Sequence, residues 1–219
     1  MISILAGLAA GSLHVISGPD HLASVAPLAV DKQRKAWVTG LRWGIGHSAG
    51  VLTVGILSLL LRDLLPLQSI SDWSERLVGV LLIAIGCWGL KKAMQIHEHD
   101  HDHNGERHVH LHAHGARAVS RKSAHNHSHT AFGIGTLHGL AGSSHFLGVL
   151  PALAFKNTAE AVAYLIAFAI GTIVAMTIFS SVVALLAGRL SFQTVTGYRT
   201  VMCLFSTTAL LVGGYWLFS

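Results

Sequence analysis

Long apolar stretches constrain this sequence more than any other feature. Six of them are long enough to cross a hydrocarbon layer about 30 Å thick as helices, some with tilt, and they cover residues 2–30, 38–61, 77–93, 131–155, 159–187 and 201–218. Only 11% of the 219 residues are charged, whereas a soluble domain is normally about 25% charged. The sequence therefore predicts an all-α, polytopic membrane protein with six transmembrane helices.

The two halves of the chain resemble each other in sequence. The segment from Gly11 reads GSLHVISGPDHLASVAPLA, and the segment from Gly135 reads GTLHGLAGSSHFLGVLPALA. At one offset of 124 residues the identical pairs are Gly11/Gly135, Leu13/Leu137, His14/His138, Gly18/Gly142, His21/His145, Val25/Val149 and Pro27/Pro151. So many matches in one register indicate an internal repeat. IGHSAG from Ile45 matches IGTIVA from Ile170 more weakly.

Three spans in each repeat determine how the halves are related. Because three is odd, the second repeat enters the membrane from the opposite face, which predicts two inverted three-helix repeats, as in many secondary transporters. The predicted units are a first repeat over residues 1–96, a histidine-rich linker over residues 97–130 and a second repeat over residues 131–219.

The distribution of Lys and Arg predicts the orientation in the membrane. Twelve of the 15 basic residues fall on the face that carries the linker, and three fall on the other face. Under the positive-inside rule the linker is then cytoplasmic and both termini are outside, in a multi-pass protein of the cell (inner) membrane. The net charge of +5 follows from this topology, so we expect the lipid bilayer, and no nucleic acid, as a partner.

Histidine is the residue that carries the chemistry of this chain. Of 16 histidines, eleven lie in the linker, and the five within predicted spans are His14, His21, His47, His138 and His145. Asp20 is the acidic residue deep within a span, where an ionised carboxylate costs about 2.5–3.5 kcal/mol. Such a residue is retained when it faces a cavity, a partner or an ion.

Gly18-Pro19 predicts a break in the first span, between two of these histidines. Proline removes a backbone donor and clashes with the preceding turn. In an unbroken helix, His14 and His21 would be about 10.5 Å apart, whereas a break can bring their rings together. Gly142-Ser143-Ser144 occupies the equivalent place in the second half, and broken spans at matching positions indicate a binding site near the midplane.

The residue types suggest which ion such a site binds. Neutral imidazole suits nickel, cobalt, copper and zinc, and a carboxylate adds charge compensation. No thiolate cluster is present to favour copper(I), and magnesium or calcium would require more carboxylates. The sequence predicts a divalent transition-metal site with the ligands His14, Asp20, His21, His47, His138 and His145.

HVISGPDH, from His14 to His21, resembles the signature of the nickel/cobalt transporter family and of its small UreH relatives. GIGHSAGV from Gly44 is similar to the second motif of that family. The compact length with six spans resembles UreH more than the eight-span members. This resemblance implies transport of nickel or cobalt, with His14, Asp20 and His21 matching the first motif and His47 the second. The first motif has five residues between His14 and Asp20, where the family has four.

Several alternatives stay open at this point. The membrane histidines could be helix-to-helix hydrogen-bonding groups, or a proton relay in an exporter of another small solute. A membrane-bound metal chaperone is a further alternative, whereas a metallohydrolase is not expected, because no His-Glu-x-x-His motif occurs. The linker could be a plain tether or a weak, multi-site metal buffer that we expect to be disordered without metal. A cytoplasmic metallochaperone is a candidate partner, and the direction of transport is open.

Overall fold

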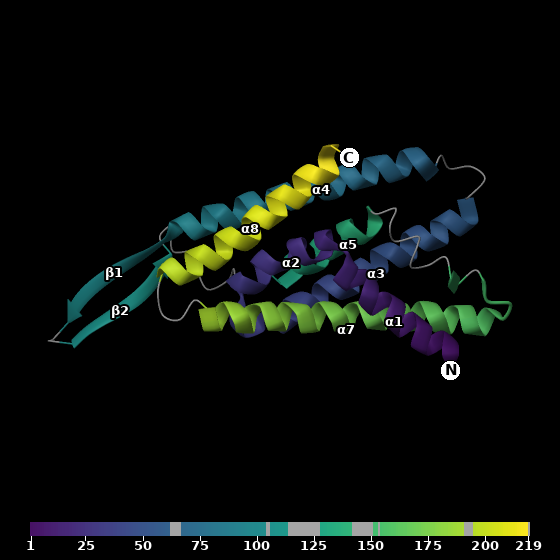
Figure 1. The fold of residues 1–219 in the computed structure, drawn as a ribbon, viewed down its shortest axis with the longest axis horizontal. Helices are drawn as coiled ribbons and strands as arrows, with labels where there is room; N and C mark the ends of the chain where they lie inside the picture. Colours follow the sequence, from purple (N-terminus) through teal and green to yellow (C-terminus); the bar gives the residue numbers. More distant parts are fainter. Residues whose placement is uncertain are drawn as a thin grey trace.

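The computed structural model describes residues 1–61, 67–103, 106–113, 128–141, 151–152, 154–190 and 195–218. It is a bundle of helices with one antiparallel hairpin at one end (Figure 1). Helices α4 and α8 pack together along one side, and α2 lies in contact with α7, α8, α3 and α4. The elements are α1 (Ile2–Ser17), α2 (Pro19–Asp31), the 3₁₀ turn η1 (Gln33–Lys35), α3 (Ala36–Leu61), α4 (Leu67–Gln95), β1 (Ile96–His103), β2 (Glu106–Ala113), α5 (Ser128–Leu140), α7 (Thr158–Leu190) and α8 (Val195–Phe218).

The predicted break in the first span is present. Helix α1 ends at Ser17, α2 begins at Pro19, and the two axes are bent by 74°. Gly18 between them has an extended backbone, with φ −91° and ψ 100°. Pro19 is the first residue of α2, where its missing N–H costs no intrahelical hydrogen bond. The His21 N–H donates to the Gly18 carbonyl at 3.1 Å and closes the first turn of α2.

The described helices are those of a multi-pass membrane protein. Within the described ranges, three helical segments are long and apolar enough to cross a membrane, and the bent pair α1–α2 is a fourth when it is counted as one span. The three segments are Glu75–Gln95, Thr158–Arg189 and Val195–Phe218. Helix α3 covers the predicted second span, and α5 covers the start of the predicted fourth, most of whose remainder lies outside the described residues. The number six stays a prediction.

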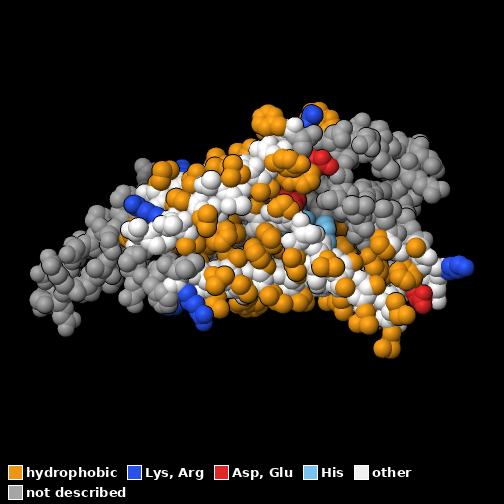
Figure 2. All heavy atoms as spheres, viewed as in Figure 1, with side chains coloured by type: hydrophobic (Ala, Val, Ile, Leu, Met, Phe, Trp, Pro, Cys, Tyr) orange, Lys and Arg blue, Asp and Glu red, His pale blue; other side chains and the backbone are white. Residues whose placement is uncertain are grey.

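The outer surface of the bundle is apolar. Large hydrophobic side chains recur every four residues along α7, where Ile166, Ile170, Val174, Ile178 and Val182 are all exposed. Figure 2 shows hydrophobic side chains over most of the described part of the visible face. Exposing this surface to water would cost free energy, whereas contact with lipid would not, because lipid tails are as apolar as these side chains. The exposed stripe on α7 is therefore a lipid-facing surface.

Glycines bring α1 and α7 into close contact. A Cβ atom on Gly7 would collide with the carbonyl oxygen of Tyr164, and one on Gly11 would collide with that of Phe168. On the facing helix α7, a Cβ atom on Gly171 would collide with the carbonyl oxygen of Leu8 on α1. Small residues that let backbones approach closely are the usual basis of helix packing in membranes.

Helices α3 and α5 pack in the same way. Gly46 leaves room for the Phe132 carbonyl, and Gly139 leaves room for the His47 carbonyl. The glycine at the start of the second repeated motif, Gly135, lies against the Trp43 carbonyl. Helix α5 is thereby held directly beside the middle of α3, where His47 lies.

The described part of the histidine-rich linker differs from the disordered segment that we expected, and residues 104–105 and 114–127 lie outside the described residues. Residues Ile96–His103 and Glu106–Ala113 form the antiparallel strands β1 and β2. The expectation of disorder considered only polarity and charge. The segment also alternates histidine with other residues, and this period of two matches the geometry of a strand.

Candidate metal centre

Five polar side chains from four helices gather around the break between α1 and α2. Four of them are buried, and the fifth, His14, is partly buried. They are His14 on α1, Asp20 and His21 on α2, His47 on α3 and His138 on α5. Five of the six predicted ligands therefore come together, although they are spread over more than half of the sequence. The sixth, His145, lies outside the described residues.

The bend places His14 against His21. Their Nε2 atoms are 3.1 Å apart, and the rings meet edge to face with centroids 4.6 Å apart. Two nitrogens bound at about 2.1 Å to one metal ion, at right or tetrahedral angles, would be about 3.0–3.4 Å apart. The spacing of these two nitrogens is therefore already that of a pair of ligands on one ion.

Asp20 connects two histidines from different helices. Its Oδ1 lies 3.0 Å from His21 Nδ1, and its Oδ2 lies 3.0 Å from His138 Nε2. An ionised carboxylate can only accept hydrogen bonds, so both imidazoles donate to it. This fixes the tautomer of neutral His21 and leaves its Nε2 lone pair directed at His14. A carboxylate that holds the far side of a ligating imidazole is the usual outer partner of a metal-bound histidine.

His47 completes the cluster from α3. Its ring centroid lies 4.8 Å from that of His21 and 5.6 Å from that of His14. The indole of Trp43 stacks almost parallel to it, with an interplanar angle of 10° and centroids 4.8 Å apart. Trp43 also lies 5.3 Å from the His138 ring. The indole therefore forms an apolar wall that holds two of the imidazoles in place.

Trp43 was not among the residues predicted from the sequence to form the site. A signal was present, because Trp43 precedes His47 by four residues and so lies on the same face of an α-helix. It is fully buried, although tryptophan in a membrane protein often lies at the membrane–water interface. Its position in the centre of the bundle was decided by the packing of α3 against α5.

Gly18 makes the arrangement of α2 sterically feasible. A Cβ atom at this position would collide with His21 Nδ1 and would lie 2.9 Å from Asp20 Oδ1. Real Cβ atoms are essentially never found at such distances. The glycine is therefore required by the two side chains that follow it as well as by the bend.

Two overlapping groups of side chains could hold a metal ion. One consists of His14, His21 and His47, and the other of Asp20, His21 and His138. In each group the ligand atoms lie within 4.8 Å of one another. His21 belongs to both, so the cluster offers two adjacent positions for one ion. Among the described residues, neither Cys87 nor Cys203 belongs to either group, so the donors are imidazole and carboxylate, without sulfur.

The chain is similar in sequence to three known proteins. Two of them come from Arabidopsis thaliana. "Chloroplast protein FOR GROWTH AND FERTILITY 1" is 36% identical over 177 residues, which cover 80% of this chain and 48% of the relative. "Chloroplast protein FOR GROWTH AND FERTILITY 2" is 37% identical over 177 residues, which cover 80% of this chain and 45% of the relative. This chain thus spans about half the length of these two relatives. The third, "Urease accessory protein UreH" from Bacillus sp. (strain TB-90), is 28% identical over 192 residues, covering 84% of this chain and 78% of UreH. The predicted likeness to UreH is therefore found, although the identity to the two plant proteins is higher.

The family assignment rests on nearly the whole chain. No solved structure matches this chain. A sequence model of one membrane-protein family, described as "Cytochrome C biogenesis protein transmembrane region", matches residues 3–216. The match includes both halves of the chain and every residue of the cluster around Gly18. The chain belongs to this family of membrane proteins.

Proposed function

We propose that this chain is a membrane transporter of a divalent transition-metal ion, nickel or cobalt, which is bound as substrate by the cluster at the helix break together with His145. The observation that carries the proposal is the convergence of four imidazoles and one carboxylate on a broken helix inside the bundle. Burying an ionised group in a membrane is costly, and the groups that persist there mark ion pathways. The similarity to UreH supports a metal as the substrate.

The donor set favours a borderline metal ion. Imidazole nitrogens suit nickel and cobalt, and the Asp20 carboxylate reduces the charge that a divalent ion brings into the membrane. A sulfur-free set with one carboxylate is a poor match for copper(I), and it is also a poor match for magnesium or calcium. We therefore expect selectivity for nickel and cobalt over magnesium.

Equivalent contacts in the two halves support the inverted repeats. At an offset of 124 residues, Gly11 on α1 corresponds to Gly135 on α5. The weaker match of IGHSAG from Ile45 with IGTIVA from Ile170 has an offset of 125 residues, and at this offset Trp43 corresponds to Phe168. Gly11 packs on the Phe168 carbonyl, and Gly135 packs on the Trp43 carbonyl. The contact between α1 and α7 is thus repeated between α5 and α3.

The same relationship extends to the cluster. His14 lies 5.5 Å from the Phe168 ring, and its counterpart His138 lies 5.3 Å from the Trp43 ring. In transporters with inverted repeats the substrate binds between the repeats, and access alternates as one repeat rocks against the other. We therefore assign residues 1–96 and 131–219 to the two repeats and residues 97–130 to the linker.

The ends of the helices support the proposed orientation. Helices α2, α4 and α7 end at one end of the bundle, where α3 and α8 begin and where the linker leaves α4. The basic residues at this end include Arg34, Lys92, Arg189 and Arg199. By the positive-inside rule this end faces the cytoplasm. Both termini would then face the outside.

Uptake into proteoliposomes tests the proposal. Wild-type protein should move nickel or cobalt across the bilayer and leave magnesium behind. His21→Ala should abolish this movement, because His21 belongs to both groups of ligand atoms. The matched control is Ser206→Ala, which also removes a buried polar group but lies on α8, packed against α4. Transport by a folded His21→Ala protein at the wild-type rate would contradict the assignment.

A proton relay is a second candidate, and one observation favours it. His14, His21, Asp20 and His138 form a continuous chain of polar contacts of 3.0–3.1 Å. Such a chain could carry protons that drive an exporter of another small solute. Calorimetry with nickel or cobalt separates the two functions: a stoichiometric complex that is lost in His21→Ala supports metal transport, whereas proton flux without metal binding supports the relay.

A further inference from the structure

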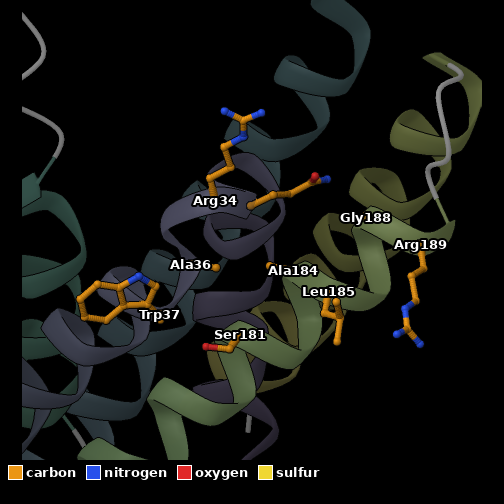
Figure 3. Close-up of a pocket in the computed structure, with 9 residues that line it drawn as sticks. Arg34, Ala36, Trp37, Ser181, Ala184, Leu185, Gly188 and Arg189 are labelled. Atoms are coloured by element: carbon orange, nitrogen blue, oxygen red, sulfur yellow. The ribbon is translucent and has the colours of Figure 1, made fainter.

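A pocket opens on the surface of the bundle between α3 and α7, and none of the residues that line it belongs to the histidine cluster. Its volume is about 460 Å³. It lies at the start of α3 and in the last third of α7, where the helices reach their basic ends. Ala36 and Ala184 are buried beneath it, and Leu185 and Gly188 lie along α7. Figure 3 shows this apolar floor across the seam between the two helices.

Two arginines flank the apolar floor. Arg34 precedes α3, Arg189 is close to the end of α7, and both are exposed. Figure 3 shows them on the two sides of the seam, with their side chains extending in opposite directions. No carboxylate lines the pocket, and within the described ranges neither guanidinium forms an ion pair. The nearby Asp31 is paired with Lys92, so among the described side chains no carboxylate neutralises the positive charge at the rim.

The apolar floor (Ala36, Ala184 and Leu185) and the basic rim (Arg34 and Arg189) together suit an amphipathic, negatively charged ligand. Guanidinium groups bind phosphate oxygens through paired hydrogen bonds. The Ala36, Ala184 and Leu185 side chains suit an acyl chain, and the polar residues Gln33 and Ser181 also line the pocket. Trp37 beside the pocket is 54% exposed, as is usual for tryptophan at the level of lipid headgroups. Basic pockets between transmembrane helices are suited to anionic headgroups.

We propose that this pocket binds an anionic glycerophospholipid, with the phosphate at Arg34 and Arg189 and one acyl chain along the floor. The lipid contacts both α3 and α7. These helices are already joined beneath the pocket by the hydrogen bond from Ser180 Oγ to the Ala36 carbonyl, at 2.6 Å. The site is independent of the metal cluster and of what the cluster transports.

Native mass spectrometry of the full chain in detergent tests the site. The protein is titrated with phosphatidylglycerol and, separately, with phosphatidylcholine that has the same acyl chains. Wild-type protein should retain phosphatidylglycerol preferentially. R34Q/R189Q should weaken that binding about 25-fold, since each basic residue near an anionic surface contributes about fivefold. R76Q/K156Q removes the same number of charges outside the pocket and should leave the preference intact.

A second variant probes the floor without changing the charge. A Cβ atom on Gly188 would meet only Gln33 Oε1, at 3.8 Å, so Gly188→Leu extends into the pocket without a backbone clash. It should lower retention of phosphatidylglycerol, whereas Gly188→Ala should not. Equal retention by wild type and R34Q/R189Q would overturn the proposal. Displacement of the lipid by an equal concentration of glycerol phosphate would also overturn it, because the site would then bind phosphate without a lipid.

Discussion

Asp20 on α2 and His138 on α5 are 118 residues apart in the chain, yet Asp20 Oδ2 lies 3.0 Å from His138 Nε2. The other oxygen of the same carboxylate holds His21. One buried acid therefore orients imidazoles from both halves of the protein. Its charge also offsets that of any divalent ion bound beside it.

Replacing Asp20 with Asn should weaken metal binding about 10- to 100-fold, the usual cost of losing an outer partner of a ligating histidine. Asn has the same shape but is neutral, and its amide has one accepting oxygen where the carboxylate has two. Isothermal titration with nickel or cobalt gives the Kd. Asp31→Asn, at the other end of α2, is the matched control and should bind as wild type does. An unchanged Kd for Asp20→Asn would remove Asp20 from the site.

Gly18→Ala should abolish metal binding by the cluster at the helix break, while the helices still form and the linker still binds metal. The added methyl group would collide with the His21 ring, so the ring must move away from His14. Gly133→Ala is the control, because a Cβ atom there meets nothing within 4 Å. Circular dichroism measures the helix content, and calorimetry measures binding. If Gly18→Ala binds metal with wild-type affinity, the close approach of Gly18 and His21 is not needed for the site.

Replacing residues 97–129 with a neutral linker of similar length should preserve the initial uptake rate but lower the number of metal ions bound per protein. The linker holds eleven of the 16 histidines, whereas we assign transport to the cluster inside the bundle. Metal held by the linker in the intact protein should be released as the pH falls below about 6.5, where imidazole protonates and loses its lone pair. Uptake at saturating metal and the metal content of purified protein are the two measurements. A linker deletion as inactive as His21→Ala, yet folded and inserted, would contradict this division of roles.

A single cysteine placed in the linker should be labelled by a membrane-impermeant reagent only after the cells are permeabilised. The background must first lose Cys87 and Cys203, because Cys87 is exposed. Tags at the two termini should be accessible from outside in intact cells. The expectation follows from the positive charge at the linker end of the bundle. Labelling of the linker in intact cells would reverse the proposed orientation.

The local features of the site could be predicted from sequence. Proline and glycine act on the backbone of their own turn, so Gly18-Pro19 was sufficient to predict the break that the structure contains. The break implied that His14 and His21 could meet, because only seven residues separate them. The apolar stretches likewise predicted a membrane protein, since composition alone reports the solvent that surrounds a helix.

Longer-range features needed the tertiary structure. The repeat related His138 to His14, but it did not reveal that His138 binds the same carboxylate as His21. The hairpin in the linker was missed because its alternating histidines were interpreted only through their polarity.

The sequence by itself determined that the helices lie in a membrane, where the first helix is broken, and which residue types are available to bind an ion. Each of these depends on composition or on neighbouring residues. The tertiary structure alone decided that Trp43 stacks on His47 and that α5 brings His138 to Asp20. These contacts depend on how closely glycines let α3 approach α5. That distance is set by two surfaces that are far apart in the chain, and no local pattern specifies it.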